Sequence, residues 1–287
     1  MSRRCEIILG PTGVGKTAHA IRRALEVGSP VVSCDSRQIF QELKIGTAAP
    51  SDEEMAAVSH YFVRCIPVTR NYTAGIYEVE ALDLVNRLFA EGHETVVLCG
   101  GSMLYIDAFC YGLDDFPEVP LQLREHLMEC LRDEGVEVLS EQLKELDPVS
   151  YEELDLSNGQ RVIRALEVSI YTGQPFSSFK TRSFKDRDFE IVKIGLERPR
   201  EELYDRINRR VEQMLEDGLE AEARAMLPYR DLPALQTVGY KEMFEYFDGK
   251  YDLETTVQHI QAATRHYAKR QLTWWRRDTD IRWIKAE

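Results

Sequence analysis

Several signals are missing from this 287-residue chain, and each absence narrows the class of protein. No uninterrupted apolar run approaches the ~18 residues that a membrane-spanning helix needs. The opening stretch, MSRRCEIILGPTG, has an apolar run too short for a secretory signal, so we expect no signal peptide. None of the six cysteines belongs to a C-x-x-C pair, so the pattern favours neither a zinc site nor a disulfide framework. A cytoplasmic protein fits these absences.

The composition is that of a globular protein, with 44% hydrophobic and 30% charged residues. The net charge of −13 argues against a nucleic-acid partner, but the charges are distributed unevenly along the chain. Residues 114–155 carry 14 acidic and 3 basic side chains, a net of −11. Residues 158–200 carry 9 basic and 5 acidic side chains, and residues 257–287 carry 7 and 3, each a net of +4. A polyanionic partner is therefore compatible with the two basic segments.

The motif GPTGVGKT follows the β-prone run Ile7–Leu9 and precedes the helix-compatible stretch Ala18–Val27. It matches G-x-x-x-x-G-K-[ST] between a strand and a helix, a setting in which backbone N–H groups and the helix N-terminus bind phosphate. Lys16 adds a mobile cation, and the Thr17 hydroxyl can bind Mg²⁺. The loop alone does not identify the phosphate compound. The predicted phosphate-binding residues are Gly10, Pro11, Thr12, Gly13, Val14, Gly15, Lys16 and Thr17.

Pro30–Ser33 and Thr95–Cys99 are predicted as two further buried strands. Asp35 follows the first of them, and a carboxylate at the C-terminal end of such a strand faces the ligand crevice of an open α/β sheet. The alternative is an ordinary turn or capping aspartate. The other strand ends in two glycines, without the metal-binding aspartate usual in nucleotide-hydrolysing enzymes. A single carboxylate beside a diphosphate clamp suits a transfer reaction with one proton to remove, and it suits a small-molecule kinase equally well.

The alternation of strands and helices predicts an α/β fold, a P-loop NTPase-like parallel sheet flanked by helices. The alternation breaks near residues 112–120, which carry two prolines, and resumes with a strand at Phe189–Leu196. We therefore expect a catalytic core of residues 1–115 and 188–287, with a mostly helical insertion domain of residues 116–187. Leu121–Leu146 and Arg200–Leu227 are each predicted to form one long helix.

Seven motifs occur in the order GPTGVGKT, DSRQIF, IGTA, GGSMLY, NGQRVIRALEV, TVGYKE and AKRQLTWWRR. Together they resemble the tRNA dimethylallyltransferase (tRNA isopentenyltransferase) family over residues 6–284. The joint pattern is highly specific, whereas the phosphate-binding loop alone is not. Ser102 stands where many members have threonine, which retains the hydroxyl, and Lys241 stands where some have arginine, which retains only the charge.

The resemblance implies transfer of a dimethylallyl group from dimethylallyl diphosphate to the exocyclic amine of the adenosine 3′ of the anticodon, in tRNAs reading codons that begin with U. The loop then grips the diphosphate instead of ATP, and Asp35 takes the proton of the amine. Thr17 and Lys16 stabilise the departing diphosphate, and Thr17 ligates Mg²⁺. The implied tRNA contacts are Asp35, Ser36, Arg37, Gln38, Ser102, Gln160, Arg161, Val162, Ile163, Arg164 and Lys241.

The implied partners are the anticodon stem-loop of tRNA, contacted by the insertion domain, and dimethylallyl diphosphate. We expect a monomer without a membrane association. The alternative for Arg161 and Arg164, three residues apart on one helix face, is an ordinary solvated flank. Rival functions are an adenylate isopentenyltransferase acting on free nucleotides, a small-molecule kinase, and a non-catalytic tRNA-binding paralogue. A free nucleotide needs neither the helical insertion nor the basic C-terminal helix, so the first rival is disfavoured.

Overall fold

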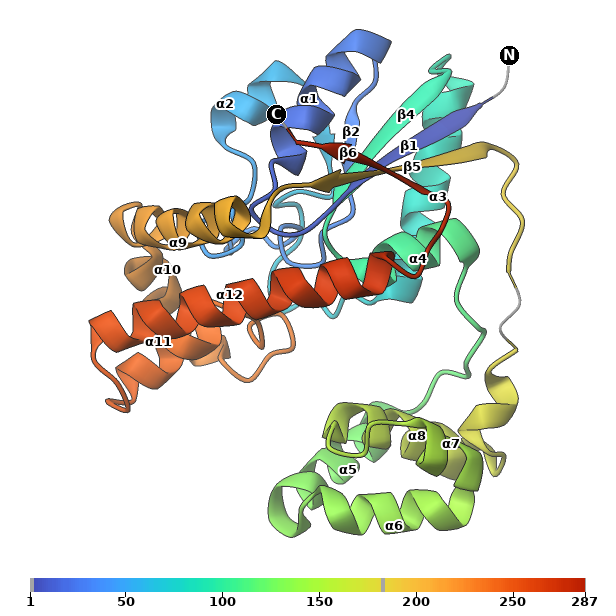
Figure 1. Ribbon diagram of the computed structural model, residues 1–287. Helices are drawn as coiled ribbons and strands as arrows, with labels where there is room; N and C mark the ends of the chain where they lie inside the picture. Colours follow the sequence, from blue (N-terminus) through green and yellow to red (C-terminus); the bar gives the residue numbers. More distant parts are fainter. Residues whose placement is uncertain (1–2, 182–183, 287) are drawn as a thin grey trace. The chain divides into compact units, whose positions relative to one another are not determined.

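The structure is a computed structural model that describes residues 3–181 and 184–286. It divides into a core unit, residues 1–111 and 186–287, and an inserted unit, residues 112–185 (Figure 1). The sequence predicted the insertion at 116–187. Its C-terminal boundary falls earlier because Arg187 belongs to the core, where it donates to the carbonyls of Ala108 and Phe109 at 3.0 and 2.8 Å. The same guanidinium pairs with the buried Glu78 at 3.1 Å.

The core unit contains a six-stranded, wholly parallel sheet with the strand order β3-β2-β4-β1-β5-β6. The strands are β1 (Arg4–Leu9), β2 (Val31–Ser33), β3 (His60–Tyr61), β4 (Thr95–Gly100), β5 (Glu190–Glu197) and β6 (Ile281–Lys285). The inner strands β1, β2 and β4 are largely buried and apolar, as parallel strands covered on both faces require. The predicted α/β fold with a parallel sheet is confirmed.

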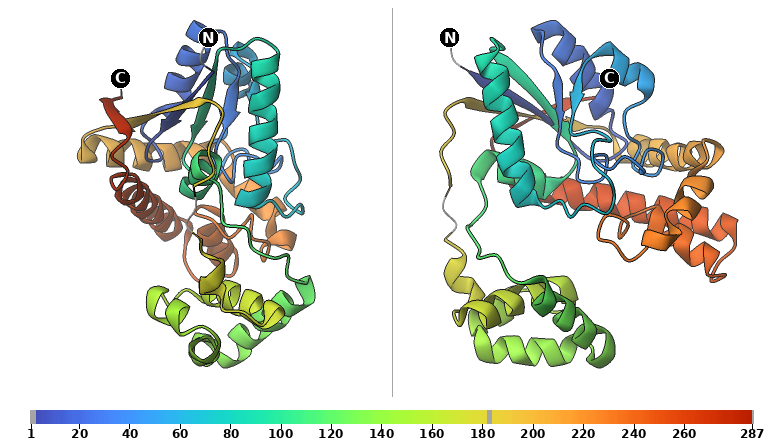
Figure 2. Two further views of the ribbon diagram at one scale, coloured as in Figure 1. Left: turned by 90° about the vertical axis from the view of Figure 1, so that its right-hand side faces the viewer. Right: turned by 180° about the vertical axis from the view of Figure 1, so that it is seen from behind.

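Helices cover both faces of this sheet, and α1 and α3 lie on opposite faces (Figure 2). Ile8 of β1 packs in one cluster with Ala20 and Ala24 of α1, which fixes the helix against the strand it follows. The helices of the core unit are α1 (Lys16–Val27), α2 (Asp52–Ala57), α3 (Ala74–Ala90), α4 (Met103–Tyr111), α9 (Arg200–Glu216), α10 (Leu219–Ala225), η2 (Leu227–Tyr229), α11 (Tyr240–Phe247) and α12 (Leu253–Trp275).

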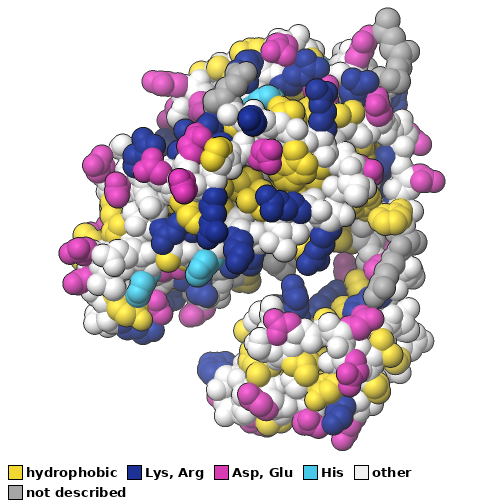
Figure 3. Space-filling model, viewed as in Figure 1, with side chains coloured by type: hydrophobic (Ala, Val, Ile, Leu, Met, Phe, Trp, Pro, Cys, Tyr) yellow, Lys and Arg dark blue, Asp and Glu magenta, His cyan; other side chains and the backbone are white. Residues whose placement is uncertain are grey.

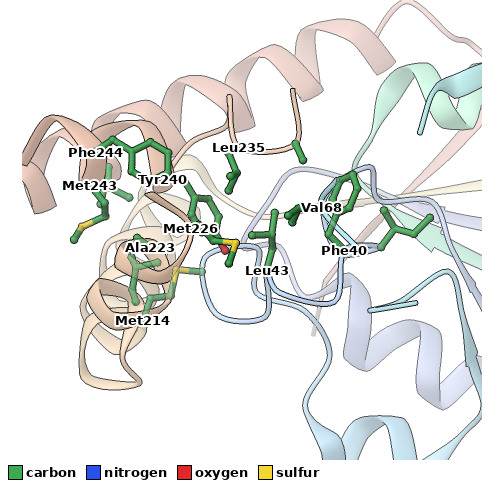
Figure 4. Close-up of a cluster of buried hydrophobic side chains, with 14 of the residues drawn as sticks. Phe40, Leu43, Val68, Met214, Ala223, Met226, Leu235, Tyr240, Met243 and Phe244 are labelled. Atoms are coloured by element: carbon green, nitrogen blue, oxygen red, sulfur yellow. The ribbon is translucent and has the colours of Figure 1, made fainter. Parts of the chain in front are cut away.

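A second hydrophobic cluster joins α9, α10 and α11 to the loop that follows β2. Figure 4 shows Phe40 and Leu43 of that loop opposite Met226 of the α10 segment and Tyr240 of α11. Leu43 and Tyr240 have no exposed surface. The helices after β5 therefore pack directly against the loop that begins at Asp35.

The inserted unit is helical and contains α5 (Leu121–Glu134), α6 (Val136–Leu146), α7 (Pro148–Glu153), α8 (Gly159–Thr172) and η1 (Phe176–Phe179). The prediction of one helix over Leu121–Leu146 is wrong because the chain breaks at Gly135, where φ is 89°. The prediction of one helix over Arg200–Leu227 is wrong for the same reason at Gly218, where φ is 104°. In both places an apolar face continues on either side of the break, so periodicity alone does not reveal it.

The last residue of α4 before the insertion is anchored to the core. Lys193 of β5, whose side chain is 7% exposed, binds the hydroxyl of Tyr111 and pairs with Asp278 at 2.6 Å. The Tyr111 hydroxyl also contacts Asp278 at 3.0 Å. Among the described residues, no helix is long and apolar enough to cross a membrane.

Candidate active site

The phosphate-binding loop presents its amide groups because its carbonyl groups are held from outside. Arg198 donates from Nε to the carbonyl of Val14 at 2.8 Å, and Arg206 donates from Nε to the carbonyl of Gly13 at 3.0 Å. Helix α1 begins at Lys16, and its N-cap Gly15 has no side chain to satisfy the first N–H groups. These amides and the positive end of the helix therefore form an anion site.

The conformation of the phosphate-binding loop also depends on Gln271 of α12, which is fully buried. Its Oε1 accepts a hydrogen bond from the amide of Thr12 at 2.8 Å, and its Nε2 donates to the carbonyl of Gly101 at 2.7 Å. The ammonium of Lys16 donates to the carbonyl of Pro11 at 3.0 Å. The Gln271 side chain thus joins the phosphate-binding loop to the glycines at the end of β4.

Besides Arg198 and Arg206, two further cations lie at the loop, Lys16 and Arg210, and the sequence pattern predicted only Lys16. Burial lowers the pKa of Lys16 to about 8, an effect that nearby Cys99 and Asp35 oppose. Burial also lowers the pKa of Arg210 to about 10, with Arg206 adding to the shift and Asp35 opposing it. Arg210 donates to the hydroxyl of Thr12, while its buried Nε has no hydrogen-bond partner among the described residues. An anion in the loop would satisfy this unmet donor.

Asp35 lies two residues after the end of β2, at the edge of the sheet where β1 ends in the phosphate-binding loop. Its Oδ1 accepts hydrogen bonds from the amides of Arg37 and Gln38 at 2.9 and 3.2 Å. Its Oδ2 accepts none from the described residues, and the negative charge of the carboxylate partly opposes the lowering of the pKa of Lys16 and of Arg210. One oxygen therefore fixes the carboxylate, and the other is free to accept a proton.

The residues after Asp35 are held in a defined conformation. The hydroxyl of the buried Ser102, at the start of α4, accepts from the amide of Ser36 at 2.8 Å and donates to its hydroxyl at 3.0 Å. The amide group of Gln38 donates from Nε2 to the carbonyls of Thr47 and Ala48 at 3.1 and 2.9 Å. Arg37 donates to the Ser36 carbonyl at 3.3 Å. The structure thus brings together the predicted DSRQ residues, Ser102 and the loop.

The predicted tRNA-contacting segment belongs to α8 of the inserted unit. Val162 and Ile163 have no exposed surface and belong to the core of that unit, so their side chains hold the unit together, and their contact with tRNA stays a prediction. Arg161 on the same helix is exposed and forms no salt bridge with the described residues. Arg164 pairs with the buried Glu167 at 2.7 Å and covers the ring of Phe116.

The two remaining predicted contacts differ in their surroundings. Gln160 accepts a hydrogen bond from Arg124 at 3.0 Å at the surface of the inserted unit. Lys241 lies exposed on α11 of the core unit and makes none of the described contacts with the phosphate-binding loop. Lys and Arg side chains gather on the face of the core unit over α12 (Figure 3). Those of α12 and its C-terminal end that are exposed there are Lys269, Arg270, Arg276 and Arg277.

The donor set fits Mg²⁺ in one particular way. Among the described residues, no group of three His, Cys, Asp or Glu side chains could hold a metal ion by itself. The hydroxyl of Thr17 stands beside the anion site without a hydrogen-bond partner in the described chain. Mg²⁺ binds readily through substrate phosphates, water and few protein ligands. The residues present therefore fit an ion held mainly by a diphosphate, with Thr17 as a protein ligand.

The parallel sheet, the amide-rich loop at the start of α1 and the carboxylate beside it define the class of P-loop-like α/β proteins. A family model described as IPP transferase matches residues 38–278. The chain is 49% identical to tRNA dimethylallyltransferase 1 of Bacteroides thetaiotaomicron, covering 98% of this chain and 91% of that protein. It is 52% identical to tRNA dimethylallyltransferase 2 of Porphyromonas gingivalis, covering 98% and 93%.

The solved structures agree with these relatives. The structure of the tRNA isopentenylpyrophosphate transferase of Bacillus halodurans matches with a TM-score of 0.71 and 34% identity, covering 99% of this chain and 90% of that one. The chain belongs to the IPP transferase family.

Proposed function

We propose that this protein is a tRNA dimethylallyltransferase. It transfers the dimethylallyl group of dimethylallyl diphosphate to the exocyclic amine of the adenosine 3′ of the anticodon, in tRNAs that read codons beginning with U. Relatives about half identical over nearly the whole chain carry that name, which supports the reaction. The observation that carries the proposal is the free Oδ2 of Asp35 beside an anion-binding loop.

Asp35 acts as the base in this proposal. The amine nitrogen of adenine bonds to the allylic carbon, the bond from that carbon to the diphosphate oxygen breaks, and the amine proton passes to Oδ2. The exocyclic amine is a poor nucleophile because its lone pair is delocalised into the ring. A positioned base contributes roughly 10²–10⁴-fold to the rate of such a step.

The phosphate-binding loop stabilises the leaving group. Negative charge grows on the diphosphate as the allylic bond lengthens, and the free amides of the loop and the N-terminal end of α1 stabilise that charge. Lys16 and Arg210 add positive charge in the same place, and Arg210 brings an unsatisfied donor. Such preorganised groups bind the transition state more strongly than the substrate. When bound, Mg²⁺ would neutralise part of the diphosphate charge.

The adenine is recognised by residues close to Asp35, which accepts its proton. They are Ser36, Arg37, Gln38 and Ser102. The nucleotide leaves its stack to reach that position, as enzymes that modify bases require. Exposed basic residues on the core unit and Gln160, Arg161 and Arg164 on the inserted unit bind the phosphates of the anticodon stem-loop. We further propose a monomer that acts in the cytoplasm; light scattering of the purified protein tests its oligomeric state.

The decisive experiment supplies dimethylallyl diphosphate with unmodified tRNA, with AMP or ATP alone, and with no acceptor. Mass spectrometry of the nucleosides is expected to show dimethylallyl-adenosine only from the tRNA reaction. Prenylation of the free nucleotide would instead identify an adenylate isopentenyltransferase. Consumption of ATP without prenylation would identify a kinase. Binding of tRNA without any transfer would identify a non-catalytic paralogue.

A further inference from the structure

A carboxylate remote from the phosphate-binding loop organises the loop that follows β2. Glu222 of α10 accepts hydrogen bonds from three consecutive amides, those of Lys44, Ile45 and Gly46, at 2.9, 2.8 and 2.8 Å. It also accepts a hydrogen bond from the hydroxyl of Tyr240 at 2.6 Å. Four donors on one carboxylate hold this turn more firmly than its own backbone hydrogen bonds would.

The site is built for this contact. Tyr240 is fully buried, and Figure 4 shows its ring projecting from α11 toward the loop that carries Leu43. Burial and the neighbouring Glu222 hold the pKa of Tyr240 well above its usual value, so its hydroxyl remains a donor. A Cβ on Gly46 would lie 2.7 Å from the Tyr240 ring, so only glycine lets the turn approach so closely.

The turn that Glu222 holds also fixes the side chain of Gln38. The carbonyls of Thr47 and Ala48 take both N–H groups of the Gln38 side chain, so its amide has a single orientation. Its Oε1 then has no partner among the described residues. The backbone amide of Gln38 donates to Oδ1 of Asp35 at 3.2 Å. Gln38 is thus joined to Asp35 through its backbone amide, while the turn fixes the orientation of its side-chain amide.

We propose that Glu222 is a positioning residue, which holds residues 44–48 so that Gln38 Oε1 accepts a hydrogen bond from the target base beside Asp35. The inference rests on the proposed function, because it assigns Gln38 to the adenine. Glu222 itself touches neither substrate. Its effect on transfer therefore passes through Gln38, which distinguishes it from a residue that only stabilises the fold.

Glu222→Gln keeps the size of the side chain but replaces an acceptor oxygen with a donor that faces backbone N–H groups. Glu220→Gln on the same helix is the matched control, since within the described chain Glu220 forms an exposed pair with Arg224 and no other contact. We expect Glu222→Gln to lower kcat about tenfold, because misplacing a binding group by a fraction of an ångström has effects of this order. The KM for dimethylallyl diphosphate stays within about twofold, since the phosphate-binding loop is untouched.

A double-mutant cycle with Gln38→Ala decides whether Glu222 acts through Gln38. In the Gln38→Ala background we expect Glu222→Gln to change kcat less than about twofold. The same tenfold loss in both backgrounds would overturn the proposal, because it would indicate a general loss of folded enzyme. An unchanged kcat in Glu222→Gln would overturn it as well.

An NMR measurement separates this inference from the proposed function. In Glu222→Gln we expect hydrogen exchange of the amides of residues 44–46 and of the Gln38 side-chain NH₂ to quicken about tenfold or more. If the wild-type protein prenylates no tRNA, the proposed function fails. The exchange rates still show whether Glu222 holds residues 44–46 and the Gln38 side chain in place. Unchanged protection of the Gln38 side chain would overturn the positioning role whatever the activity.

Discussion

At the scale of single residues, the candidate site depends on how the two oxygens of Asp35 differ. Its position after β2, at the ligand edge of a parallel sheet, fitted a ligand-facing carboxylate and an ordinary turn aspartate equally well, and the family resemblance implied the role of base. Only the structure shows that Oδ1 is bound by two amides and that Oδ2 is open. A capping aspartate would need only the first of these features.

Asp35→Asn should therefore keep the local fold while removing the base. The side-chain oxygen can still accept from the amides of Arg37 and Gln38, but an amide cannot take a proton from adenine. We expect kcat to fall about 10²–10⁴-fold. The affinity for tRNA, measured by filter binding, should change less than about threefold. Transfer at nearly the wild-type rate would exclude Asp35 as the base.

Lys16 gives a pH dependence whose sign follows from burial. Because folding lowers its pKa to about 8, the charged form costs stability at neutral pH, and the unfolded chain holds more protons between pH 8 and the usual lysine pKa. The stability of the ligand-free protein should therefore rise with pH in that window. Thermal unfolding should show this rise for the wild type but not for Lys16→Met. A rise of equal size in both proteins would exclude Lys16 as its source.

The same titration weakens the anion site. Above about pH 8, the free enzyme loses the Lys16 charge, so the KM for dimethylallyl diphosphate should increase with pH. Lys16→Met should show a high KM at all pH values and no such increase. Stability and binding thus change in opposite directions over one pH range.

At the scale of elements, the strands were more predictable than the helices. The runs that became β1, β2 and β4 are short and apolar, which buried parallel strands require. The helix breaks at Gly135 and Gly218 were missed because each break joins two helices with apolar faces. Arg210 was missed because its partner, Thr12, lies 198 residues away in sequence, so no local pattern connects them.

Helix α8 offers a matched pair of arginines three residues apart. Arg161 is exposed and outside any salt bridge of the described chain, whereas Arg164 pairs with the buried Glu167. We expect Arg161→Ala to weaken tRNA binding and to reduce the salt dependence of log K by about one unit of slope. Arg164→Ala should in addition lower the stability of the inserted unit by about 1–2 kcal/mol, since it removes a hydrogen bond to a buried charge.

Titrations of tRNA at several salt concentrations, together with thermal unfolding, separate these two effects. Equal salt slopes for wild type and Arg161→Ala would assign that residue to a solvated flank. Equal stability of Arg164→Ala and the wild type would show that Arg124 alone satisfies Glu167, with which it pairs at 2.9 Å.

At the scale of the whole molecule, the inserted unit carries 15 acidic and 8 basic side chains, a net of −7 out of −13, while the phosphate-binding loop and the exposed basic residues of α12 belong to the core unit. The inserted unit begins at Gly112 and ends at Lys185. These two residues lie side by side, because a Cβ on Gly112 would lie 2.5 Å from the side chain of Lys185. A short linker can therefore join the two chain segments of the core unit when the insertion is removed.

Replacing residues 113–184 with a short Gly-Ser linker tests this division of labour. We expect the shortened protein to bind inorganic diphosphate within about threefold of the wild-type affinity, by calorimetry, because the loop and its arginines remain. Its affinity for tRNA should fall at least about tenfold. Undiminished tRNA affinity would exclude the inserted unit from RNA binding.

The anchored ends of α4 and β5 have one further consequence. Tyr111 is secured through Lys193 and Asp278, and Arg187 is secured through Glu78 and two carbonyls of α4. Both ends of the inserted segment are thus attached to the core unit beside residues whose side chains are held by hydrogen bonds and ion pairs.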